Sequence, residues 1–105
     1  MVVAIPFGRY QDLPADPLAG KIVIDASNYF PNRDGVFAQI DADGTTSSEL
    51  LRAYLVSARV VKAFNAIRWT CLRDAGRPAG EPDRLAIPIL GDDCEAKRVV
   101  AELID

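Results

Sequence analysis

The chain has 105 residues, half of them hydrophobic, and its 12 basic and 15 acidic residues leave a net charge of -3. This length and composition predict one small domain with a real core, and they exclude a chain that is disordered throughout. The weak negative charge argues against a broad surface for nucleic acid or anionic membranes, although it leaves room for a local phosphate site.

Side chains that commonly hold metals or act as nucleophile–base pairs are scarce. The chain has no histidine, and Cys71 and Cys94 lie far apart without a C-x-x-C pair. We therefore predict no metal site, no catalytic side chain, and free thiols in a reducing, cytoplasmic setting. The first residues lack the pattern of a signal peptide, and no run approaches the ~20 apolar residues of a membrane span, so no membrane segment is expected.

Four apolar runs predict the strands of an open, mostly parallel sheet. They are residues 2–5, 21–26, 59–64 and 85–90. Each run ends on a short polar or turn-forming segment, and ligands bind outside the carboxyl ends of the strands in such sheets. Pro88 places the fourth run at a sheet edge or an irregular start, because proline cannot donate a ladder hydrogen bond.

Helical segments are predicted between these runs. Two prolines limit residues 9–20 to a turn or two, whereas the capping box at residues 46–49 starts an amphipathic helix. A short helix is predicted over 67–75, and a final helix follows a cap at Asp92 or Asp93. The order of elements predicts an α/β, partial Rossmann-like fold of three layers, with about four strands and flanking helices.

Several polar residues at strand ends are candidates for a ligand site. Ser27 and Asn28 end the second run with a hydroxyl and an amide that could bind a ribose or a carboxamide. The alternative is an ordinary turn that opens the long connection over residues 29–44. Inside the runs, we predict a structural hydrogen bond for Asp25 and an outward-pointing side chain for Lys62, because a lone buried cation is costly.

Four segments, at residues 23–29, 45–50, 58–65 and 88–93, resemble the NADPH-dependent deazaflavin (coenzyme F-420) reductase family in order and spacing. The resemblance runs nearly end to end. It implies a Rossmann-type domain that moves a hydride between NADP and a second redox partner of the deazaflavin or flavin type. It also implies that the family's opening strand and glycine-rich phosphate loop would lie before Met1, and that the family continues beyond its match to this chain. Residues 1–105 would then be the second half of an NADP-binding domain.

The same resemblance implies a set of NADP-binding residues. It places Ile5, Pro6 and Phe7 in the turn that passes beneath the cofactor. Alternatively, this is a plain strand-ending turn with a buried phenylalanine.

The resemblance also assigns the end of the third run, Ala63, Phe64 and Asn65, to the nicotinamide end of NADP. Asn65 follows the strand where some relatives carry a histidine. An amide there can orient the carboxamide but cannot shuttle protons, and hydride transfer needs no protein base. The alternative is a strand-end amide that caps the next segment.

The resemblance implies that the first half of the family's domain would lie before Met1, and this affects how the chain is expected to associate with other chains. In Rossmann order, residues 2–5 would pair with the absent first strand, so they would form a hydrophobic edge with free backbone groups. We predict that a second copy or a complementing chain covers it. The expected function is an NADPH-dependent oxidoreductase domain, and the alternatives are a non-catalytic oligomerising remnant and a small-ligand-binding module of the same fold.

Overall fold

A computed structural model describes residues 1–105 around a parallel sheet of three strands in the order β1-β2-β3. The strands are β1 (Val2–Val3), β2 (Ile22–Asp25) and β3 (Arg59–Lys62). The central strand β2 aligns its Ile24 with Val2 on one side and with Val61 on the other. The sheet therefore joins the first three runs that the sequence predicts.

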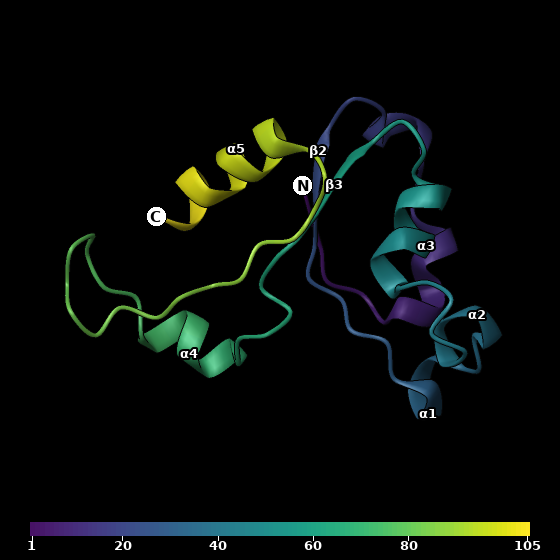
Figure 1. The fold of residues 1–105 in the computed structure, drawn as a ribbon, viewed down its shortest axis with the longest axis horizontal. Coiled ribbons are helices and arrows are strands. Elements are labelled where there is room, and N and C mark those ends of the chain that lie inside the picture. Colours follow the sequence, from purple (N-terminus) through teal and green to yellow (C-terminus); the bar gives the residue numbers. More distant parts are fainter.

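Two apolar clusters cover the two faces of this sheet. Successive residues of a strand point to opposite faces, so β2 contributes Val23 to one cluster and Ile24 to the other. Figure 1 shows α3 (Ser47–Tyr54) and α5 (Cys94–Ile104) on opposite sides of the strands. The 3-10 helices η1 (Phe7–Asp12) and η2 (Asp16–Leu18) precede β2, and Leu18 of η2 joins the cluster on the α3 side. This arrangement confirms the predicted α/β fold of three layers.

Both long helices begin where the sequence predicts. The hydroxyl of Thr46 accepts a hydrogen bond from the backbone N–H of Glu49, and the Glu49 carboxylate accepts one from the N–H of Thr46 at 2.7 Å. The carboxylate of Asp93, rather than that of Asp92, accepts from the N–H of Ala96 at 2.8 Å and caps α5. With 11 residues, α5 is the longest helix, and no helix here has the length and apolar character needed to cross a bilayer.

The connections hold three short helices. The long segment after β2 contains α1 (Pro31–Asp34) and α2 (Ala38–Asp41), and α4 (Trp69–Asp74) follows β3. In Figure 1, α4 and the loop that follows it extend away from the sheet. The helix predicted over residues 67–75 is therefore present in a shorter form.

The prediction of a fourth strand over residues 85–90 is wrong. Only Leu90 pairs, in a single antiparallel bridge to Lys62, with N···O distances of 2.8 and 3.0 Å. Pro88 has no N–H for a ladder, which is consistent with the absence of regular pairing before Leu90. The third strand also ends earlier than predicted, because Phe64 adopts a left-handed backbone with φ of 67°.

One side of β1 has no neighbouring strand. The carbonyls of Met1 and Val3 accept hydrogen bonds from the N–H groups of Ile24 and Ala26. Because adjacent residues of a strand direct their backbone groups to opposite sides, the groups of Val2 face away from β2. Val2 is also 51% exposed. The structure therefore has an open edge with an apolar side chain on it.

Candidate functional site

The carboxylate of Asp25, at the end of β2, is completely buried and has four hydrogen-bond donors. One oxygen accepts from the N–H of Ser27 at 2.9 Å and from its hydroxyl at 2.6 Å. The other accepts from the hydroxyl of Ser48 at 2.7 Å and from the ammonium of Lys62 at 3.1 Å. A buried carboxylate is tolerated only when it is partnered in this way. The predicted structural role of Asp25 is confirmed, and its network joins β2, β3 and α3.

The prediction that Lys62 points outward is wrong. Its side chain is only 14% exposed, and its ammonium also donates to the carbonyl of Ser27 at 2.5 Å. The buried carboxylate of Asp25 explains the difference, because it supplies the counter-charge that a lone lysine in an apolar strand would lack. No short-range pattern in the sequence connects these two residues.

Asn28 and Asn65 meet at the carboxyl edge of the sheet. The side-chain amide of Asn28 donates to the backbone carbonyl of Asn65 at 3.0 Å, and the amide of Asn65 lies 3.5 Å from the side-chain oxygen of Asn28. Both residues are half-buried, and the side-chain oxygen of Asn65 accepts no hydrogen bond within the chain. The pair therefore presents neutral donors and acceptors at the predicted binding edge.

The structure buries other predicted binding residues more deeply. The ring of Phe7 stacks on Tyr10 at a centroid distance of 5.0 Å and meets Phe37 edge-on at 5.1 Å. The ring therefore fills the core under the connection that follows β2, whereas Pro6 is exposed and Ile5 is half-buried. This turn lies against α1, since a Cβ added to Gly8 would come within 2.7 Å of a backbone oxygen.

The predicted residues at the end of β3 differ in what they can contact. Ala63 is completely buried in the cluster on the α5 side, and Phe64 packs against that same cluster. The left-handed backbone at Phe64 turns the chain between this cluster and Asn65. Non-glycine residues in this conformation are strained and often occur at functional sites. Ser27, in turn, is buried, with its hydroxyl bound to Asp25.

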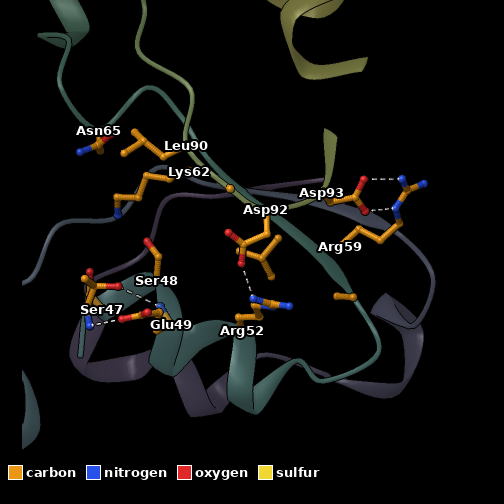
Figure 2. Close-up of a pocket in the computed structure, with 14 residues that line it drawn as sticks. Ser47, Ser48, Glu49, Arg52, Arg59, Lys62, Asn65, Leu90, Asp92 and Asp93 are labelled. Carbon is orange, nitrogen blue, oxygen red and sulfur yellow. Dashed lines mark hydrogen bonds and ion pairs between the residues drawn. The ribbon is translucent and has the colours of Figure 1, made fainter. Parts of the chain in front are cut away.

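A cavity of about 460 Å³ adjoins this edge. Figure 2 shows it between β3, the start of α3 and the segment that leads into α5. Its walls carry three basic side chains and three acidic ones, so the cavity is polar and close to neutral. These six residues are Glu49, Arg52, Arg59, Lys62, Asp92 and Asp93.

Two ion pairs line this cavity. Arg59 donates to both carboxylate oxygens of Asp93, at 2.6 and 2.8 Å, and also to Glu95 at 3.0 Å. The hydrogen bond from Arg59 and the capping N–H of Ala96 hold the pKa of the Asp93 carboxyl well below its usual range. Across the cavity, Arg52 donates to Asp92 at 2.8 Å.

Sequence reasoning missed Arg52 and Ser48 as parts of this site. Ser48 lies within the capping box, whose pattern predicts only the start of a helix. Its bond to Asp25 spans 23 residues and therefore depends on how α3 packs on the sheet.

Solved structures share this fold, and two of them are described here. A protein of Arthrobacter sp. FB24 described as a "putative F-420-dependent NADP-reductase" aligns with a TM-score of 0.71 and 26% identity, over 98% of this chain and 48% of that protein. A hypothetical protein of Sinorhizobium meliloti aligns with a TM-score of 0.74 and 31% identity, over 98% of this chain and 49% of that protein. No family model and no curated protein matches the chain.

The chain thus spans about half the length of these two proteins. Its fold is a partial Rossmann-like one, as the sequence predicts, and it is shared with a protein described as a reductase.

A second, wider hollow of about 1020 Å³ lies on the α5 side of the molecule. It separates α4 from α5, and its lining is mainly hydrophobic, including Phe64, Ile67 and Leu85. Four of its charged side chains are already paired with each other, Arg84 with Asp105 and Arg98 with Glu102. The cavity beside β3 and the adjoining asparagine pair therefore form the stronger candidate site.

Proposed function

We propose that the chain supplies the nicotinamide-side portion of an NADPH-dependent oxidoreductase site, which moves a hydride between NADP and a deazaflavin or flavin-type partner. The single observation that carries this proposal is the contact between Asn28 and Asn65 at the carboxyl ends of neighbouring parallel strands. Ligands of open α/β sheets bind at this edge. The likeness to a protein described as an NADP reductase supports the same reaction class.

The residues at this edge suit a neutral carboxamide. The free side-chain oxygen of Asn65 can accept from a carboxamide NH₂, and its NH₂ can donate to a carboxamide oxygen. NADP supplies the hydride chemistry when bound. Asn65 would orient the carboxamide, and Asn28 would hold Asn65 through the 3.0 Å bond to its backbone carbonyl.

The proposal predicts weak binding of NADPH by the isolated chain. Because no glycine-rich loop in this sequence grips the pyrophosphate, we expect a dissociation constant in the millimolar range, or about -4 kcal/mol, by calorimetry. Asn65→Ala should weaken binding about three- to tenfold, the amount expected for one or two lost hydrogen bonds. This variant keeps the backbone carbonyl that Asn28 binds, so the fold should survive.

Asn32→Ala is the matched control, because it removes an exposed amide in α1. It should leave NADPH binding unchanged. Nicotinamide mononucleotide, which carries only one end of the cofactor, should shift the NMR signals of Asn28 and Asn65. No binding by either probe would contradict the proposal and would favour a non-catalytic oligomerising module.

We also propose that the open edge of β1 is covered by a second copy of the chain or by a complementing chain. Two observations support this, the unpaired side of β1 and the exposure of Val2. Light scattering should show association of the pure chain at micromolar concentration. Val2→Lys should shift it toward monomer, because a lysine on an edge strand opposes pairing.

Val36→Lys adds the same charge at another exposed position, outside the sheet, and should leave association unchanged. A well-folded monomer at all concentrations would count against pairing between copies.

We also propose a cytoplasmic setting for the chain. The two cysteines, Cys71 and Cys94, are free thiols, which supports this proposal.

A further inference from the structure

The cavity beside β3 contains hydrogen-bond donors that the chain does not use. The ammonium of Lys62 has three N–H groups, and two of them are bound, to Asp25 and to the carbonyl of Ser27. Figure 2 shows this ammonium on the cavity side of β3, close to Ser48. The hydroxyl of Ser47, which also lines the cavity, has no partner in the chain. One charged donor and one hydroxyl therefore remain for a ligand.

The acidic side chains of the cavity are occupied elsewhere, with one exception. The carboxylate of Glu49 closes the capping box, and that of Asp93 is held by both nitrogens of Arg59. Asp92, by contrast, is 86% exposed, and its carboxylate is bound by Arg52 alone. Exposed ion pairs of this kind contribute only about 0–1 kcal/mol, so Asp92 can leave Arg52 at little cost.

The position of the Arg52–Asp92 ion pair determines which groups of the cavity can contact a ligand. In Figure 2 the pair spans the cavity, from α3 to the segment before α5. If Asp92 turns into solvent, the guanidinium of Arg52 is left without a partner in the same cavity that Lys62 lines. Both cations then line a cavity of about 460 Å³, a size typical of small-molecule sites, with no carboxylate bound to Arg52.

We propose that this cavity binds a small organic oxyanion, a carboxylate or a phosphate ester, through Lys62 and Arg52. The carboxylate of Asp92 acts as an internal competitor that occupies Arg52 when no ligand is bound. Arg52 and Lys62 both donate to oxyanions, and Arg52 can do so with two parallel bonds. This site goes beyond the proposed NADP function and does not depend on it.

The test is an NMR titration of the full chain, labelled with ¹⁵N, at constant ionic strength and without NADPH. The probes are inorganic phosphate and acetate, so that a tetrahedral and a planar oxyanion are compared. We expect saturable shifts confined to the amides around Ser48, Arg52 and Lys62. The probe that binds more tightly identifies the group that the natural ligand carries.

Three variants distinguish the proposed site from general anion binding. Asp92→Asn should tighten binding about two- to fivefold, because it removes the competitor for Arg52. Arg52→Gln should weaken binding by at least about fivefold, since it removes a charged donor. Arg98→Gln removes an equal charge from an exposed pair with Glu102 on α5 and should leave binding unchanged.

The inference is overturned if neither probe saturates, or if the shifts spread over the whole surface. It is equally overturned if Asp92→Asn and Arg52→Gln bind like Arg98→Gln. We avoid substitution of Lys62 because it would leave Asp25 buried without its cation, whereas Arg52 is 62% exposed and its loss should change stability little. Because this titration contains no NADPH, a negative result does not bear on the proposed nicotinamide site. That site is tested by the separate titration with NADPH.

Discussion

Asp25→Ala is expected to lower the free energy of unfolding by about 3–5 kcal/mol, because it removes one partner of a buried ion pair and leaves the other uncompensated. The side chain of Lys62 is 14% exposed, so its ammonium cannot fully regain water. Both hydroxyls that donate to Asp25, from Ser27 and Ser48, also lose their acceptor. Small domains have a total stability of about 5–15 kcal/mol, so this variant should be close to unfolded.

Urea unfolding at neutral pH measures this effect as a lower midpoint with an unchanged slope. The control is Asp92→Ala, which removes a carboxylate of an exposed ion pair and should change stability little. The double variant Asp25→Ala with Lys62→Met should recover part of the loss, since it leaves no buried charge. If Asp25→Ala were as stable as the native chain, the Asp25 network would not be what holds β2, β3 and α3 together.

Phe7→Ala should destabilise the chain by about 3–5 kcal/mol, the usual cost of truncating a buried aromatic side chain. The ring is 1% exposed and lies within 5.8 Å, centroid to centroid, of those of Tyr10, Tyr29 and Phe37. Its loss would open a cavity between η1 and the connection that follows β2. Thermal or urea unfolding measures the change.

Trp69→Ala is the matched control for Phe7, because it removes a larger aromatic ring that is 70% exposed. It should change stability by less than about 0.5 kcal/mol, as most surface substitutions do. NADPH binding by Phe7→Ala and Trp69→Ala also tests the predicted role of Phe7 at the cofactor. Unchanged stability of Phe7→Ala with weaker NADPH binding would show that the ring faces a ligand rather than the core.

Much of the local structure could be predicted because its determinants lie close together in the chain. Thr46 and Glu49 are three residues apart, and helical geometry alone brings their side chains to each other's backbone. The meeting of Asn28 and Asn65 could also be anticipated, although they are 37 residues apart, because carboxyl ends of adjacent parallel strands share one edge. The prediction of a fourth strand over residues 85–90 was wrong because it gave more weight to their apolar composition than to the missing N–H of Pro88.

By itself, the sequence determined the periodicity of the first three strands and of the helices, and the capping box of α3, since these depend on residues within a few positions of each other. Only the tertiary structure decided that Lys62 turns inward to Asp25, that Phe7 enters an aromatic cluster and that Arg52 reaches Asp92 across a cavity. The partners in the two ion pairs are 37 and 40 residues apart. The burial and pairing of a side chain depend on which elements pack beside it, and no local pattern specifies that neighbour.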